Sequence, residues 1–500
     1  MNAVKRNGII IAVILSIIII LFVDLDRSNH QVTVMTSIAV LMSILWITEA
    51  IPLAATSLIP LILFPIFGIL NTSEIAGSYI NSIIFLFIGG FMIALAMERW
   101  GLHKRIALKI ITVVGGSPNS IIFGFMIAAC FLSMWVSNTA TILMMLPIAL
   151  AIISRMENQF GKEETHNFTL ALLLGVAYSC TIGGLGTLVG TPPNLVFVKT
   201  LNILYPNAPE VSFSKWMLMA FPITLILLLF TLFLLTKILF KIDRALTVQK
   251  NFIKEQYDKL GKFTFEEAVV SVVFSITALL WIFRSDINIG VLKIPGWSNL
   301  FGQPEYINDG TVAVTMAFIL FLIPSQNKTT TILNKDVFVN IPWSVVLLFG
   351  GGFALAKGFT STGLSQFIGH QLSGLSALPH FVMIIIIAAS ISFLTELTSN
   401  TATTQMILPI LGSVSVAIGL HPMLLMLTAT LSASMAFMLP VATPPNTIIF
   451  ASGRVKIFEM AKTGILLNIL GIIVVSIIVY SLGTLIFDLG TMPAWAMIDK

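Results

Sequence analysis

Ser137-Asn138-Thr139-Ala140-Thr141 and Ser399-Asn400-Thr401-Ala402-Thr403 are two copies of one polar motif inside an otherwise apolar chain. An apolar arm lies on each side of each copy, at 120–136 and 140–154 for the first copy and at 380–397 and 402–418 for the second. Each arm is marginal for a membrane-spanning helix, which needs about 20 apolar residues. We therefore expect two helical hairpins that enter a membrane and turn back at the polar motif.

The two motifs belong to a longer internal repeat. Leu86-Phe87-Ile88-Gly89-Gly90-Phe91 matches Leu348-Phe349-Gly350-Gly351-Gly352-Phe353 at an offset of 262 positions (348 − 86). The same offset holds without a gap as far as Leu146-Pro147-Ile148, which matches Leu408-Pro409-Ile410. Shared apolar composition explains matching Leu and Ile, but it does not explain matching Ser-Asn-Thr. Paired, interrupted apolar segments of this kind indicate the binding site of a transporter.

A second repeated motif follows each hairpin. Thr191-Pro192-Pro193-Asn194 matches Thr443-Pro444-Pro445-Asn446 at an offset of 252 positions (443 − 191). A proline lacks the backbone N–H and clashes with the preceding turn, so each motif interrupts a helix. The predicted repeat cores are 80–198, with a hairpin tip at 137–139 and a broken helix at 183–194, and 341–450, with a tip at 399–401 and a broken helix at 442–446. We expect the two repeats to be inverted, because inversion supplies a geometry for alternating access.

The composition indicates a membrane protein. Of the 500 residues 57% are hydrophobic and 10% are charged, whereas a soluble domain has about 25% charged residues. The sequence predicts an all-α polytopic fold in a lipid bilayer, with about 11 transmembrane helices plus the two hairpins. No long soluble stretch interrupts it, so residues 1–500 form a single membrane unit. The net charge is +5, but the basic residues lie in short loops and do not indicate a nucleic-acid partner.

The positions of basic residues predict the topology, because short cytoplasmic loops are enriched in Lys and Arg. The loop 237–262 is the most basic segment and contains Lys237, Lys241, Arg244, Lys250, Lys254, Lys259 and Lys262. We expect this loop to be cytoplasmic, together with the segment that holds Lys328 and Lys335, and we expect 285–309 to be external. Lys5 and Arg6 place the N-terminus in the cytoplasm, and the first apolar run, 8–23, is expected to remain as a signal anchor. The protein is thus predicted to be a multi-pass protein of the cell membrane.

The hairpin tips suit both an anion and a cation. The start of a helix offers unpaired N–H groups and the positive end of its dipole, which favour carboxylate oxygens. The end of the preceding arm offers carbonyl oxygens, and hard cations such as sodium prefer oxygen ligands. Two tips therefore allow two cation sites beside one anion, and the cations reduce the cost of removing the anion from water.

Few ionisable residues lie inside the apolar runs, and they are Glu49, Glu98, Lys357 and Glu396. Such residues are functional candidates by default. Glu396 precedes Ser399 by three positions, so we expect it to support the second tip through hydrogen bonds. The histidines are scattered near loop ends and form no convergent nucleophile, base or metal set, so an enzyme is not predicted. Cys130 and Cys180 are expected to be small core residues.

At these motifs the sequence resembles the divalent anion/sodium symporter family, also called the INDY-type or dicarboxylate transporters. Trp46-Ile47-Thr48-Glu49-Ala50-Ile51-Pro52 and the two Leu-Phe-x-Gly-Gly-Phe stretches add to the resemblance, which covers about residues 30 to 487. The resemblance implies a homodimer with a scaffold domain and a transport domain that moves as an elevator. It also implies that sodium drives the symport of C4-dicarboxylates such as succinate, malate and fumarate.

The resemblance also implies the site residues by position. One sodium site would use Ser133, Ser137, Asn138 and Gly186, and the other would use Thr395, Thr398, Asn400 and Ala442. The substrate would contact Ser137, Asn138, Thr139, Thr187, Ser399, Asn400, Thr401, Thr443 and Pro444.

Several alternatives remain at this point. Some members of the family exchange dicarboxylates without sodium, and others carry citrate, other tricarboxylates or sulfate. The residues alone also leave open a channel or a membrane enzyme. A channel would not need two equivalent hairpins at one site.

Overall fold

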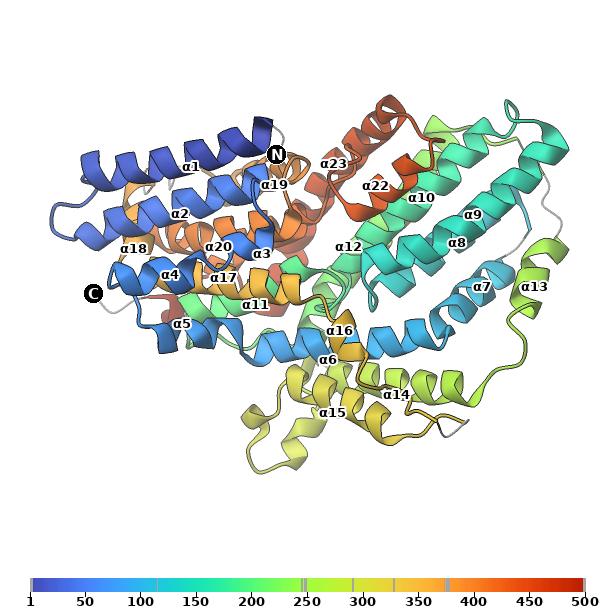
Figure 1. The fold of residues 1–500 in the computed structure, drawn as a ribbon, viewed down its shortest axis with the longest axis horizontal. Coiled ribbons are helices and arrows are strands. Elements are labelled where there is room, and N and C mark those ends of the chain that lie inside the picture. The colour runs from blue at the N-terminus through green and yellow to red at the C-terminus, as the bar shows by residue number, and fades with distance from the viewer. Residues whose placement is uncertain are drawn as a thin grey trace.

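The computed structural model describes residues 3–114, 116–243, 246, 250–289, 292–326, 329–372, 374 and 378–497. The chain is almost entirely helical in this part, as expected from the composition (Figure 1). The helices of the first half are α1 (Ala3–Phe22), α2 (His30–Thr48), α3 (Leu53–Thr56), α4 (Ile59–Ile66), α5 (Thr72–Tyr79), α6 (Ser82–Arg99), α7 (Leu102–Val114), α8 (Pro118–Ser133), α9 (Asn138–Phe160), α10 (His166–Leu185), α11 (Pro192–Leu204) and α12 (Phe213–Phe233), which continues as a π-helix (Leu234–Leu239).

The second half has a matching series of helices after a short linking helix, α13 (Lys250–Asp258). They are α14 (Phe265–Ile282), α15 (Asp309–Leu322), α16 (Val337–Asn340), α17 (Trp343–Ser361), α18 (Leu364–Gln371), α19 (His380–Thr395), α20 (Asn400–Ala417), α21 (Pro422–Ala433), α22 (Pro444–Ala451), α23 (Ile457–Ile478), which continues as a π-helix (Val479–Gly483), and α24 (Thr484–Phe487). An antiparallel pair, β1 (Ile287–Ile289) and β2 (Leu292–Ile294), and short 3₁₀ turns at Trp297–Leu300, Pro304–Tyr306 and Ala494–Ala496 complete the described elements.

The sequence repeat is also a structural repeat. Helix α8 starts at 118 and α19 starts at 380, and α9 starts at 138 and α20 at 400, so both pairs keep the offset of 262. Helices α11 and α22 start at 192 and 444, which keeps the offset of 252. In each half a helix, a four-residue turn and a second helix form a hairpin whose turn lies at the predicted tip. The second arm of the first hairpin, α9, is longer than the predicted 140–154 and has the length of a membrane span. The second break is longer than the predicted 442–446, because α21 ends at Ala433 and α22 begins only at Pro444.

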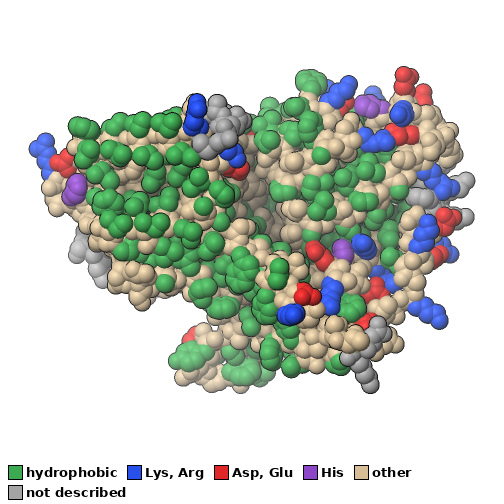
Figure 2. Space-filling model, in the orientation of Figure 1, with side chains coloured by type: hydrophobic (Ala, Val, Ile, Leu, Met, Phe, Trp, Pro, Cys, Tyr) green, Lys and Arg blue, Asp and Glu red, His purple; other side chains and the backbone are tan. Residues whose placement is uncertain are grey.

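The helices form the large apolar surface that a bilayer requires. In the described part of the chain, nine helices are long and apolar enough to span a membrane, and five apolar helices are shorter. The shorter ones include α8, α19 and α21, which belong to the hairpins and to the second break. Charged side chains gather near the ends of α9 and α13, whereas the face over α1 and α2 is mostly apolar (Figure 2). Arg244 and Lys328 of the predicted cytoplasmic segments lie outside the described residues.

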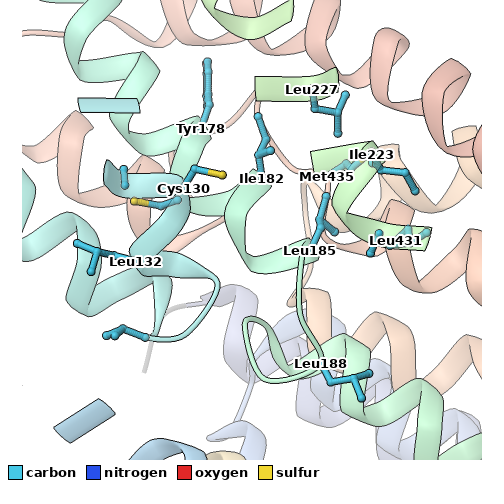
Figure 3. Packing of buried hydrophobic residues seen from close by; sticks show 14 of the residues in the cluster. Cys130, Leu132, Tyr178, Ile182, Leu185, Leu188, Ile223, Leu227, Leu431 and Met435 are labelled. Carbon is cyan, nitrogen blue, oxygen red and sulfur yellow. The ribbon is translucent and has the colours of Figure 1, made fainter. Parts of the chain in front are cut away.

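Helix α10 lies at the centre of the packing. Every residue from Phe168 to Leu185 is buried, and α10 contacts α8, α9, α12 and α22. Figure 3 shows part of this core around α10, with Cys130, Ile182 and Met435 labelled. Cys130 and Cys180 are free and buried, as expected of small core residues. Helix α10 therefore holds the first hairpin, and through α22 it contacts the second repeat.

Gly183 is required where α10 crosses the end of α8. A Cβ atom at this position would overlap the backbone of Cys130, which cannot move aside as a flexible side chain can. We expect Gly183→Ala to destabilise the protein by about 1–3 kcal/mol, the usual cost of overpacking. The melting temperature of the detergent-solubilised protein measures this effect. Gly302→Ala is the control, because no atom lies within 4 Å of its added Cβ; equal melting temperatures for the two variants would contradict the packing argument.

Candidate functional site

Each hairpin tip presents the unpaired start of a helix. Ser137 is the N-cap of α9, and its Oγ accepts a hydrogen bond from Ala140 N at 3.2 Å. Ser399 caps α20 in the same way, with Ala402 N at 3.5 Å. Within the described residues, no protein atom accepts from the N–H groups of the two residues that follow each cap, Asn138 and Thr139 or Asn400 and Thr401. Both tips therefore present the unpaired helix start that the sequence predicted.

A pair of oxygen atoms lies behind each tip. Ser133 Oγ donates to Asn138 Oδ1, and at the matching positions Thr395 Oγ1 donates to Asn400 Oδ1 at 2.6 Å. Ser133 and Thr395 are fully buried, each at the end of the first helix of its hairpin. Hydroxyl and amide oxygens are ligands that suit sodium. The structure thus brings together, in each repeat, two of the residues predicted for a sodium site.

Two buried asparagines hold the interrupted helices. Asn194 Nδ2 donates to Gly184 O at 3.1 Å and to Thr187 O at 2.7 Å. Asn446 Nδ2 donates to Ala436 O at 3.3 Å and to Leu439 O at 3.0 Å, and both acceptors match those of the first repeat at the offset of 252. A break frees carbonyl groups that lipid cannot satisfy. The last residue of each Thr-Pro-Pro-Asn motif supplies the missing donor.

Both tips and both breaks line one cavity of about 1170 Å³. The molecule is visibly hollowed near its centre, beside the first turns of α1 (Figure 2). Ten predicted site residues line this cavity: Ser137, Asn138, Thr139, Thr398, Ser399, Asn400, Thr401, Ala442, Thr443 and Pro444. The volume exceeds the roughly 300–1,000 Å³ of ordinary ligand pockets. The space therefore includes an open vestibule as well as a binding site.

Thr187 does not line the cavity, although it was predicted to contact substrate. Its side chain is fully buried, and Oγ1 donates to Met134 O in the first tip while it accepts from Gly190 N at 3.1 Å. These bonds tie the first break to the first tip. Gly186 is likewise absent from the cavity wall and lies against the side chain of Met134.

Several cavity residues were not predicted. Thr191 and Thr447 supply further hydroxyl groups, Phe87 and Phe91 of α6 form an apolar wall, and Lys5 adds a charge. Glu49, one of the intramembrane candidates of the sequence, also lines the cavity. The repeat could have identified Thr191, because it is the counterpart of Thr443, a predicted site residue (443 − 191 = 252). The aromatic residues of α6 carry no such signal, since apolar residues are common throughout the chain.

The two tips have different surroundings. Trp135 of the first tip stacks on Trp281 of α14 with ring centroids 6.4 Å apart, and Phe274 meets it edge-on at 5.2 Å. Its counterpart in the second tip is Leu397 (135 + 262), whose side chain is 71% exposed. Val441, the counterpart of Val189, is 78% exposed. The first tip is therefore packed against α14, whereas the second borders open space.

The comparison with known proteins confirms the resemblance seen in the motifs. The family model described as the sodium:sulfate symporter transmembrane region matches residues 3–489. The chain belongs to this family of membrane transporters. It is 43% identical to the sodium-dependent dicarboxylate transporter SdcS of Staphylococcus saprophyticus, over 96% of this chain and 92% of that protein. It is 41% identical to SdcS of Staphylococcus aureus, over 96% of this chain and 91% of that protein.

Two solved structures have a similar fold at low sequence identity. MtrF of Neisseria gonorrhoeae superimposes with a TM-score of 0.58 and 14% identity, covering 91% of this symporter-family chain and 96% of MtrF. The YdaH transporter of Alcanivorax borkumensis gives a TM-score of 0.56 and 12% identity, covering 82% of this chain and 87% of YdaH. These likenesses support the all-α polytopic fold.

The asparagines of the breaks give a test of the site's framework. Asn194→Leu or Asn446→Leu leaves two buried carbonyl groups without their donor, and an unsatisfied buried polar group costs about 1–3 kcal/mol. We expect a lower melting temperature for each variant than for the wild-type protein. Asn202→Leu is the matched control, because Asn202 lies on α11 but is exposed. A control that melts as early as the two break variants would refute this role.

Proposed function

We propose that this chain carries C4-dicarboxylates such as succinate, malate or fumarate across the cell membrane by sodium-coupled symport. The observation that carries the proposal is the convergence of two equivalent helix starts on one cavity, each with an oxygen pair behind it. The names of the relatives, which are sodium-dependent dicarboxylate transporters, support the same substrate and the same ion. A dicarboxylate has two anionic ends, and the site has two anion-binding tips.

In this proposal each carboxylate of the substrate meets one tip. The unpaired N–H groups and the Asn and Thr side chains of 138–139 and 400–401 donate hydrogen bonds to the two carboxylates. Ser137 and Ser399 begin the two helices, and Thr443 and Pro444 of the second break complete the wall. Thr191 is added to this set, because it lines the cavity as the counterpart of Thr443.

Two sodium ions are proposed to bind beside the substrate. The first site comprises Ser133, Ser137, Asn138 and Gly186, and the second comprises Thr395, Thr398, Asn400 and Ala442. Two monovalent cations neutralise a dicarboxylate, which lowers the cost of moving it out of water. A tenfold sodium gradient contributes about 1.4 kcal/mol per ion to uptake. A third ion would move net charge and add about 2.3 kcal/mol per 100 mV of membrane potential.

The movement is proposed to be of the elevator type in a homodimer with inverted repeats. The hairpins, α10–α12 and α21–α23 form the transport domain, and the remaining membrane helices form the scaffold. With a cytoplasmic N-terminus, Lys5 and Pro342 at the edge of the cavity lie on the cytoplasmic side. We propose that this conformation is open to the cytoplasm, which is consistent with the exposed side chains of Leu397 and Val441 in the cavity.

Uptake of labelled succinate into proteoliposomes tests the coupling. An inward sodium gradient should drive accumulation, and an equal potassium gradient should not, because sodium is proposed to bind together with the substrate. Preloading the vesicles with unlabelled succinate separates symport from exchange. Uptake that requires internal dicarboxylate and does not depend on sodium would show that the protein is a sodium-independent exchanger, which would contradict the proposal. Labelled citrate and sulfate, tested in parallel, show whether another anion is preferred.

Asn138→Ala and Asn400→Ala test the site itself. Each substitution removes an amide that is proposed to contact both sodium and substrate, so we expect uptake to fall at least 100-fold in either variant. Each substitution also removes the acceptor of a buried hydroxyl, Ser133 or Thr395, so the melting temperature should fall as well, and uptake is compared at equal amounts of folded protein. Asn202→Ala on the exposed face of α11 should transport normally. Near-normal uptake by both cavity variants would place the site elsewhere.

A further inference from the structure

Glu396 is a buried carboxylate between the second tip and the second break. It follows the last residue of α19 and is 3% exposed. Its Oε1 accepts from Phe437 N at 2.7 Å and from Met438 N at 2.9 Å. Its Oε2 accepts from Met438 N at 3.1 Å and from Leu439 N at 3.0 Å. One side chain thus pairs three consecutive N–H groups of the break.

A fourth donor ties the same carboxylate to α23. Asn468 Nδ2 donates to Glu396 Oε1 at 2.8 Å, and Asn468 is fully buried. All four partners are donors, which is the pattern that suits an ionised carboxylate. Hydrogen bonds to an ionised group are shorter and stronger than neutral ones. Glu396 therefore joins the end of α19, the second break and α23. The sequence suggested that Glu396 supports the second tip through hydrogen bonds, but its carboxylate bonds to the second break and to α23.

The first repeat performs the same task with neutral groups. The counterpart of Glu396 is Met134 (396 − 262), whose carbonyl oxygen accepts from Thr187 Oγ1. Trp216 of α12 donates its Nε1–H to Leu185 O, the end of α10, at 3.0 Å. Both repeats thus hold their breaks through a residue of the tip and through a side chain of the next long helix, α12 or α23. The first repeat has Met134 where the second has the carboxylate of Glu396.

Glu396 lies next to residues of the second sodium site proposed above. The hydroxyl of its neighbour in the chain, Thr395, lies within hydrogen-bond distance of two acceptors, Asn400 Oδ1 at 2.6 Å and Ala433 O at 2.7 Å, which share its single proton. Ala442 follows Leu439, one of the bonded residues, by three positions. The hydrogen bonds of Glu396 therefore fix the spacing between the tip half and the break half of that site. A negative charge so close to the site also favours a cation there.

We propose that Glu396 is a positioning residue for the second sodium site. It does not bind the ion, because both of its oxygens already accept hydrogen bonds from the protein. It holds the break at the distance from the tip that sodium requires, and its charge strengthens cation binding at this site relative to the first. The inference rests on the proposed sodium coupling.

Glu396→Gln is the direct test. Glutamine has about the same shape, but it loses the charge and turns an NH₂ group toward the N–H donors of the break. We expect the sodium concentration for half-maximal succinate uptake to rise at least tenfold, which corresponds to about 1.4 kcal/mol. The KM for succinate, measured at saturating sodium, should change less than about twofold. Glu396→Asp keeps the charge and should recover part of the sodium affinity.

A second readout does not depend on transport. Sodium should raise the melting temperature of the purified wild-type protein in a saturable way, because an ion that binds only the folded state stabilises it. The Glu396→Gln curve should saturate at a correspondingly higher sodium concentration. Trp216→Phe, which removes a buried hydrogen bond beside the first break, should shift the curve by less than about threefold.

The outcomes separate this inference from the proposed function. If neither the uptake nor the melting temperature of the wild-type protein depends on sodium, both the inference and the proposed function are overturned. A sodium-dependent wild type with an unchanged sodium curve in Glu396→Gln would overturn the positioning role alone, as would an equal shift in Trp216→Phe. If Glu396→Gln does not fold, the Asn468→Leu variant tests the positioning role instead. This variant keeps the carboxylate but removes one donor, and it should shift the sodium curve about two- to threefold; no shift would overturn the role.

Discussion

Inside a bilayer, a backbone N–H or C=O group that leaves a helix must find a partner within the protein, because lipid offers none. Four of the places where the chain leaves its helices in the two repeat cores line the cavity, namely the two tips and the two breaks. Asn194 and Asn446 satisfy carbonyl groups of the breaks, and Glu396 satisfies N–H groups of the second break. The groups that remain unpaired at the tips face the cavity and are thereby left for a ligand.

The internal repeat makes much of this arrangement predictable. A motif that recurs at a fixed offset identifies equivalent positions without any knowledge of the fold, so both tips and the starts of α9 and α20 could be located. The same logic would have added Thr191 to the site. Ten of the predicted residues line the cavity, since the side chains around a helix start point to a common side.

The internal repeat could not predict contacts between residues far apart in the sequence. Glu396 bonds to residues 41 to 43 positions away, and the period of a helix or a repeat does not encode that pairing. Thr187 belongs to the predicted broken helix 183–194, as do Thr191 and Pro192 of the cavity wall, but its hydroxyl donates to the carbonyl of Met134. Only the packing of the first tip against the break decides this contact. The second break begins eight residues before the predicted 442, at Ser434, because its N–H groups have a carboxylate partner and need no helix there.

The charges in the cavity connect the site to coupling. Among the described residues that line it, Lys5 is the only basic side chain, and it lies on α1 outside both repeat cores. Helix starts and neutral amides attract a dianion only weakly when it has to lose its water. A fixed arginine at the tips would bind the substrate without any ion. In the proposed site, sodium supplies the positive charge, so the anion binds well only when the ions are present. A carrier built in this way couples uptake of the anion to the sodium gradient. The loaded form that can cross the membrane without unpaired charge contains both the anion and the sodium ions.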